Sequence, residues 1–211
     1  MKMKFISTLV LAALVSTACG VPFLLKAAQK GENEKIQTML DDGADINTVG
    51  TLGYTALIEA AQNGHPDTVK LLLEKGALPN HQAFYGYTAL MAAAEKGDNK
   101  SIILLLDNGA NMEQKGKNGA CALSYAIENG HLETVKLLLD KGADANTTNK
   151  DHLTVLMLAS KSGNAEIVSL LLDKGANLNM MDHNQQTALS LAQKHGHFAI
   201  VDLLKKAGAM K

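Results

Sequence analysis

Short apolar runs alternate with polar stretches along this chain, and the pattern returns every 33 residues. In residues 53–77, apolar positions follow helical spacing twice, first around Leu57 and then through Val69, Leu72 and Leu73, which predicts two short helices. Two series of glycines keep the same spacing, at Gly31, Gly64, Gly97, Gly130, Gly163 and Gly196, and at Gly43, Gly76, Gly109, Gly142, Gly175 and Gly208. A fixed period of this length indicates a solenoid, in which each unit buries its apolar face against its neighbours.

Residues with known terminal preferences mark the ends of the two helices. Thr55 is expected to cap the first helix, because its hydroxyl can accept a hydrogen bond from a free amide of the first turn. Gly64 suits the left-handed position after that helix, and Pro66 suits the first turn of the second helix. Later units place Thr88, Cys121, Thr154 and Thr187 at the position of Thr55. We expect Cys121 to be a small buried residue there.

The units resemble the ankyrin-repeat family over about residues 22 to 211. The resemblance is carried by the threonine-led first helix, by the Gly-His steps and by the Gly-Ala-Asp/Asn endings. The Gly-His steps are Gly64-His65, Gly130-His131 and Gly196-His197, and the endings are Gly43-Ala44-Asp45, Gly109-Ala110-Asn111, Gly142-Ala143-Asp144 and Gly175-Ala176-Asn177. The resemblance implies an L-shaped stack of helix pairs with projecting hairpin fingers, which works mostly by protein recognition.

We therefore expect an all-α ankyrin-repeat solenoid of six stacked helix-turn-helix units with projecting hairpin loops. The domain is expected to occupy residues 19–211, with units at approximately 22–49, 50–82, 83–115, 116–148, 149–181 and 182–211.

Two of the fingers depart from the pattern. The earlier fingers carry Gly53, Gly86 and Gly119, whereas His152 and Gln185 stand at the same place in the last two. Because glycine adopts a positive φ at little energetic cost, we expect the last two fingers to adopt a different turn.

The start of the chain predicts an export signal. Met1–Lys4 contains two lysines, Phe5–Val15 is uncharged and mainly apolar, and Ser16-Thr17-Ala18 offers small residues to a signal peptidase. This arrangement is typical of a bacterial-type secretory signal in residues 1–18, or up to residue 20, and indicates a periplasmic or secreted protein. The alternative is that the run is a buried first helix of the solenoid. A permanent membrane span takes roughly 20 apolar residues, which this run lacks.

Cys19 leaves two routes of export open. Cleavage after Ala18 or Gly20 would release a soluble protein, which is the preferred interpretation. Acylation of Cys19 would instead attach a lipoprotein to the envelope. Ser16 stands where a lipobox prefers leucine, and only two residues separate Cys19 from Pro22 and the first helix.

Charge and motifs argue against nucleic acid binding and against catalysis. Without Lys2 and Lys4, the 20 basic residues become 18 against 21 acidic ones, a net charge of −3, and every basic residue is lysine. Nucleic-acid-binding domains carry a basic stripe, and planar phosphate recognition favours arginine. We find no HExxH, paired CxxC, phosphate loop or GxSxG motif. His65, His131 and His197 are expected to serve helix packing, so we predict no enzyme activity, no cofactor and no metal.

The candidate binding surface is where the units differ from one another. The chain has four tyrosines and four phenylalanines, and half of these eight fall on two adjacent fingers. Aromatic side chains dominate binding hot spots because they offer large contact area at low entropic cost. The predicted protein-binding residues are Tyr54, Gln62, Asn63, Phe84, Tyr85, Tyr87, Glu95 and Lys96. The alternative is that the aromatic rings pack between neighbouring fingers and stiffen that edge.

These observations predict a monomeric, non-catalytic scaffold or adaptor that binds an unidentified protein through its finger loops and first-helix surface. One alternative is an exported effector or lipid-anchored protein that acts on a host or envelope target. The third hypothesis is that the protein is an enzyme, but no pair of catalytic nucleophile and base can be named in the sequence.

Overall fold

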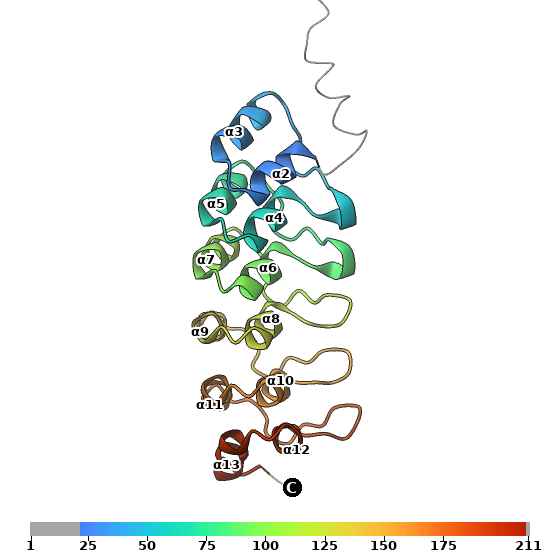
Figure 1. Ribbon diagram of the computed structural model, residues 1–211, viewed down its shortest axis with the longest axis vertical. Helices are drawn as coiled ribbons and strands as arrows, with labels where there is room; N and C mark the ends of the chain where they lie inside the picture. The colour runs from blue at the N-terminus through green and yellow to red at the C-terminus, as the bar shows by residue number, and fades with distance from the viewer. Residues whose placement is uncertain (1–21, 210–211) are drawn as a thin grey trace, which may run out of the picture.

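Residues 22–209, which the computed structural model describes, form helix pairs stacked one on another along the long axis of the molecule (Figure 1). The first helices of the pairs are α2 (Phe23–Gln29), α4 (Ala56–Gln62), α6 (Ala89–Lys96), α8 (Ala122–Glu128), α10 (Val155–Ser162) and α12 (Ala188–Lys194). The second helices are α3 (Asn33–Asp41), α5 (Pro66–Glu74), α7 (Asn99–Asp107), α9 (Leu132–Asp140), α11 (Ala165–Asp173) and α13 (Phe198–Lys206). The expected signal segment and Cys19 lie outside the described residues.

The stack is three layers deep. Second helices form one side, first helices form the middle, and hairpin fingers project from the other side (Figure 1). The fingers have their tips at residues 50–54, 83–87, 116–120, 149–153 and 182–186, and are called the first to fifth fingers below. The first two tips contain short 3₁₀ turns, η1 (Thr51–Gly53) and η2 (Phe84–Gly86). The all-α solenoid predicted from the 33-residue period is confirmed.

Two columns of identical residues run through the core. The first helices contribute a column of alanines that are fully buried, at Ala60, Ala93, Ala126, Ala159 and Ala192. The second helices contribute a column of fully buried leucines, at Leu72, Leu105, Leu138, Leu171 and Leu204. Each helix packs against its counterpart in the next pair. Small side chains let the first helices approach closely, and the leucines fill the space beside them.

The predicted helix caps are present. The hydroxyl of Thr88 accepts a hydrogen bond from the amide of Met91 at 3.3 Å, and Thr55, Thr154 and Thr187 cap their helices in the same way. Cys121 is buried, with its Sγ 3.6 Å from the hydroxyl of Ser124. Pro66 is at the first turn of α5, as expected. The residues that precede the apolar runs therefore fix where these helices begin.

The Gly-His steps tie neighbouring pairs together, which confirms a packing role for these histidines. The imidazole Nε2 atoms of His65, His131 and His197 lie 3.0, 2.9 and 3.1 Å from the carbonyl oxygens of Gln29, Glu95 and Lys161. Each of these carbonyls belongs to the first helix of the preceding pair. Gly97 leaves room for this contact, since a Cβ there would lie 2.9 Å from the ring of His131.

Asparagine side chains form a similar ladder at the base of the fingers. The side-chain oxygens of Asn47, Asn80 and Asn146 accept hydrogen bonds from the backbone amides of Leu78, Asn111 and Asn177, at 3.0, 2.7 and 2.8 Å. Each bond joins one unit to the next. The fingers are therefore fixed relative to one another at their base, where the chain leaves the second helix.

The expected change of turn in the last two fingers is wrong in its central point. His152 and Gln185 keep the left-handed conformation of the glycines they replace, each with φ of 59°. In every finger the first tip residue donates its amide to the carbonyl of the last, as Gly50 does to Tyr54 at 2.8 Å. The first two fingers do differ from the others, because Leu52 and Tyr85 are also left-handed there. The third finger, which has Gly119, shares the single left-handed residue of the fourth and fifth.

Side chains at the start of the tip explain why glycine is not needed. The side-chain oxygen of Asn149 accepts hydrogen bonds from the amides of Asp151 and Leu153, both at 2.9 Å. Asp182 accepts in the same way from Asn184 and Gln186, both at 2.8 Å. Asparagine and aspartate stabilise turns through such bonds to the following backbone, and this offsets the strain of a left-handed histidine or glutamine.

Candidate functional site

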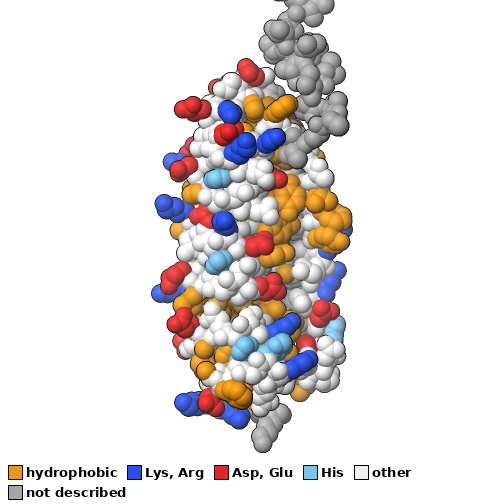
Figure 2. All heavy atoms as spheres, viewed as in Figure 1, with side chains coloured by type: hydrophobic (Ala, Val, Ile, Leu, Met, Phe, Trp, Pro, Cys, Tyr) orange, Lys and Arg blue, Asp and Glu red, His pale blue; other side chains and the backbone are white. Residues whose placement is uncertain are grey.

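The predicted binding residues lie on the finger side of the stack and on the adjoining face of α4 and α6. Figure 2 shows hydrophobic side chains gathered on this side beside the second and third pairs, with acidic side chains next to them. Gln62 and Lys96 are exposed at the ends of α4 and α6, and Asn63 donates its side-chain amide to the carbonyl of Glu59 at 2.8 Å. The aromatic members separate into two groups, one exposed and one packed.

Phe84 and Tyr85 form the exposed group at the tip of the second finger. Their side chains are 48% and 62% exposed, and their rings meet edge to face with centroids 4.2 Å apart. Leu52 on the first finger is 58% exposed and stands at the position that Tyr85 occupies one unit later. We call Leu52, Phe84 and Tyr85 the fingertip ledge. The sequence prediction missed Leu52, although its register with Tyr85 was a signal that could have found it.

Two of the ledge residues are held in a strained backbone conformation. Leu52 has φ of 62° and Tyr85 has φ of 60°. Large side chains rarely adopt this left-handed region, because the Cβ approaches the neighbouring carbonyl oxygen. Such strain gathers at functional sites and needs support from the surrounding structure. Here it coincides with the two most exposed large apolar side chains of the finger edge.

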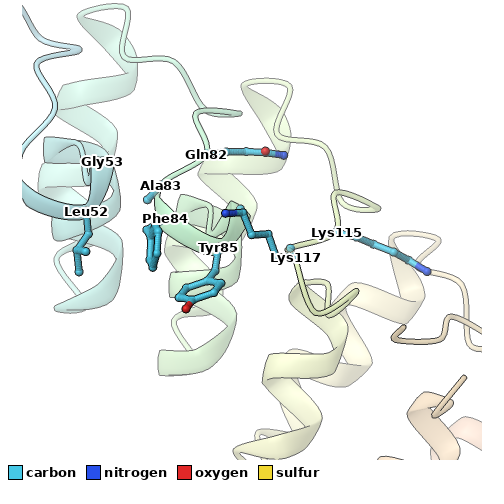
Figure 3. A pocket seen from close by; sticks show the side chains of 10 residues that line it. Leu52, Gly53, Gln82, Ala83, Phe84, Tyr85, Lys115 and Lys117 are labelled. Carbon is cyan, nitrogen blue, oxygen red and sulfur yellow. The ribbon is translucent and has the colours of Figure 1, made fainter. Parts of the chain in front are cut away.

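A groove lies beside the ledge and continues to the third finger (Figure 3). The side chains of Leu52, Phe84 and Tyr85 extend in one direction from their fingers, and Lys117 reaches back toward the rings. The ammonium of Lys117 lies 5.1 Å from the centre of the Phe84 ring and 5.5 Å from that of Tyr85. A lysine ammonium at this distance is attracted by the electron-rich ring faces. The backbone also joins the fingers here, since Lys117 donates its amide to the carbonyl of Tyr85 at 2.6 Å.

The packed group is a row of tyrosines along the face of the first helices. The ring centres of Tyr54 and Tyr87 are 6.1 Å apart, and those of Tyr87 and Tyr125 are 5.5 Å apart. We call these three residues the tyrosine row. Tyr87 is only 9% exposed, so a partner can reach little of its ring. The sequence prediction missed Tyr125. In the 33-residue repeat, Tyr125 occupies the same position as Glu59, which differs from the position shared by Tyr54 and Tyr87.

Carboxylates accompany the tyrosine row. The hydroxyl of Tyr87 donates to the carboxylate of Glu95, and burial together with this bond raises the pKa of Tyr87. Burial likewise raises the pKa of Glu59, on α4. At Glu128, burial raises the pKa of the carboxyl, and the nearby Lys161 partly opposes that rise. The face of the first helices carries three glutamates beside aromatic rings, whereas the fingertip ledge presents apolar surface beside Lys117.

Within residues 22–209, no three histidine, cysteine or acidic side chains come together as metal ligands would. The rings of His152 and His183 lie 4.3 Å apart on the fourth and fifth fingers, as an exposed pair. Within residues 22–209, no helix has the length and the apolar character that crossing a bilayer requires.

The chain matches a family model described as ankyrin repeats (3 copies), over residues 7–83, 24–116, 78–149 and 123–211. It belongs to the ankyrin-repeat family. No curated protein matches this ankyrin-repeat chain. Family membership supports a protein–protein interaction scaffold, and the ankyrin-repeat family is generally non-catalytic. In this ankyrin-repeat protein, the fingertip ledge and the tyrosine row are the surfaces that distinguish the second, third and fourth pairs from the others.

Proposed function

We propose that this ankyrin-repeat protein is a non-catalytic scaffold that binds a protein partner through the tips of its first three fingers and the adjoining face of α4, α6 and α8. The observation that carries the proposal is the fingertip ledge. Three large apolar side chains are about half exposed on neighbouring fingers, and two of them are held in a strained conformation. Contiguous exposed apolar surface on a soluble protein marks an interaction site.

The scaffold around the ledge supports this proposal. The asparagine bonds join the bases of neighbouring fingers, so the ledge is presented on a rigid base. A preorganised surface loses little conformational entropy on binding. The tyrosine row extends the same surface toward the helices, and a partner spanning both areas could reach the roughly 1,200–2,000 Å² that specific interfaces bury.

We also propose that the protein acts in the periplasm or outside the cell. Support comes from the sequence of residues 1–18 alone, which lie outside the described residues. Cell fractionation tests this proposal, with the mature protein expected in the periplasmic or extracellular fraction. Retention in the membrane fraction after a salt wash would favour acylation at Cys19, and recovery of the full-length chain from the cytosol would contradict export.

Affinity capture from cells that make the protein tests the binding surface. The wild-type chain is compared with Phe84→Thr/Tyr85→Asn, which carries residues that the chain itself uses at these finger positions in Thr51 and Asn118. Lys70→Ala on the exposed side of α5 is the control. We expect a partner that is lost from the finger variant and kept by the control. A partner kept by the finger variant and lost by the control would place binding on the second helices.

A further inference from the structure

The fingertip ledge is strained in a way that the fold itself does not require. Tyr85 is left-handed and exposed, yet the equivalent Asn118 of the third finger has no positive φ, and that finger closes with the same hydrogen bond between its first and last tip residues. The chain can therefore build this finger without a strained aromatic residue. Both left-handed residues of this position, Leu52 and Tyr85, project apolar side chains into solvent. Strain that packing does not explain points to a ligand contact.

The charge at the ledge has a definite sign. The ammonium of Lys117 lies over the rings of Phe84 and Tyr85, and among residues 22–209 no carboxylate lies within ion-pairing distance of it. The other lysine that lines the groove, Lys115, points away and donates to the carbonyl of Thr148 at 2.8 Å (Figure 3). Lys117 is thus an exposed cation beside an apolar surface, and it forms no ion pair with the described residues.

The face of the first helices beside the tyrosine row carries acidic side chains. Glu59, Glu95 and Glu128 lie near the tyrosine row, and Lys161 opposes part of this charge at Glu128. An acidic group of a partner is therefore repelled from the helices and attracted to the fingertips. The contrast between these glutamates and Lys117 favours the fingertips as the place where an acidic side chain of a partner binds.

From these features we propose that the groove along the fingertip ledge binds an extended segment of a protein partner that carries an aromatic or leucine-like side chain next to an aspartate or glutamate. The apolar side chain packs against Leu52, Phe84 and Tyr85, and the carboxylate pairs with Lys117. This inference rests on the proposed function and adds the chemistry of the partner.

A protein segment fits the surface better than a lipid bilayer does. The ledge borders an open groove lined by residues of three fingers, and a narrow protein segment fits such a groove better than a flat membrane surface does. Stable membrane attachment also needs more than one contribution, such as a larger apolar face or a cluster of basic residues. The ledge offers three apolar side chains and one unpaired lysine, and acidic side chains lie nearby on the helices.

Selection from a random library of 12-residue peptides displayed on phage, against the full-length chain, tests the proposal. We expect enriched peptides to carry an aromatic or leucine-like residue within a few positions of an acidic one. A synthetic copy of the most enriched peptide is then measured by fluorescence anisotropy. Tyr85→Asn should weaken its binding by at least about tenfold, the loss expected when a central aromatic contact is removed.

Two lysine variants test whether the charge of Lys117 contributes to peptide binding. Lys117→Gln should weaken peptide binding about fivefold and should remove most of its dependence on salt, as expected for one charge-assisted contact. Lys150→Gln, at the equivalent position of the fourth finger, is the matched control and should bind like the wild type.

Tyr85→Asn should keep or raise the melting temperature, because asparagine tolerates the left-handed conformation better than tyrosine does. Loss of binding with retained stability separates a ligand contact from a structural role.

Four results would overturn the proposal. Enrichment of basic peptides, or of peptides whose binding is unchanged by Tyr85→Asn and Lys117→Gln, would remove the ledge from the site while leaving a protein-binding scaffold. The absence of any enriched peptide would refute this partner chemistry, and the affinity capture experiment would still decide the scaffold function. Sedimentation with vesicles of phosphatidylethanolamine and phosphatidylglycerol completes the test, because vesicle binding lost in the same two variants would identify the ledge as a membrane contact.

Discussion

At the scale of single residues, side chains at fixed positions of the repeat decide where the helices and turns begin. The threonine before four of the first helices satisfies a backbone group that would otherwise lack a partner, and so do the histidine and asparagine that recur in three units each. The helix caps could be predicted because the capping residue and the apolar run that it precedes are neighbours in sequence. The partner of each histidine lies 36 residues earlier, so only its general packing role could be predicted.

Thr88→Ala should lower the stability of the protein. The threonine is buried, and its hydroxyl accepts the amide of Met91 at 3.3 Å, so alanine leaves a helix-end donor unpaired. The free energy of unfolding should fall by about 1 kcal/mol, measured by urea denaturation. Thr88→Ser keeps the hydroxyl and serves as the control. Equal stability of the alanine variant and the wild type would show that the cap is not needed in this context.

Glu59→Gln should change how stability depends on pH. Burial raises the pKa of Glu59 above its ordinary value of 4.5, so the folded protein holds this proton more tightly than the unfolded chain does. The free energy of unfolding contributed by this group therefore falls as pH rises above 4.5 through the raised value. Glutamine removes that fall, and should give a small gain in stability at pH 7 with a flatter profile at acidic pH. Urea denaturation at several pH values measures the free energy of unfolding of both proteins. The same pH dependence in the wild type and the variant would contradict a raised pKa at Glu59.

At the scale of elements, the helices could be predicted from the sequence and the finger turns could not. Apolar periodicity reports directly which face of a helix is buried, which is why both helices of each unit were foreseen. The turn prediction considered only the glycine position, and the stabilising groups at Asn149 and Asp182 are three residues earlier in the chain. Tyr125 was missed for a related reason, since it is on a helix whereas Tyr54 and Tyr87 are the last residues of finger tips.

The fourth finger provides a direct test of this explanation. Asn149→Ala removes the acceptor of two backbone amides, and should lower the free energy of unfolding by about 1 kcal/mol. His152→Gly relieves the left-handed strain and should raise it by about 1 kcal/mol. In the double variant, glycine should recover part of the loss caused by alanine, as measured by a thermal or urea double-mutant cycle. An Asn149→Ala variant as stable as the wild type would mean that the turn is held by other contacts.

At the scale of the whole molecule, the protein is a linear stack in which each pair contacts only its neighbours. In such solenoids stability comes from the units and from the interfaces between adjacent units, so the surface residues of a finger can vary without disturbing distant pairs. This explains how exposed and strained residues at the first two fingertips coexist with a regular core. It also explains why the sequence predicted the architecture more readily than the binding surface, because the core repeats and the surface does not.

Site-specific photo-crosslinking in living cells tests the central claim, that the finger side of the stack is the binding surface. A photoreactive phenylalanine derivative is placed at Tyr85 on the fingertip ledge and, in a second strain, at Lys136 on the exposed face of α9. We predict a discrete crosslinked protein species from position 85 and none from position 136. A crosslinked species from position 136, with none from position 85, would contradict the account.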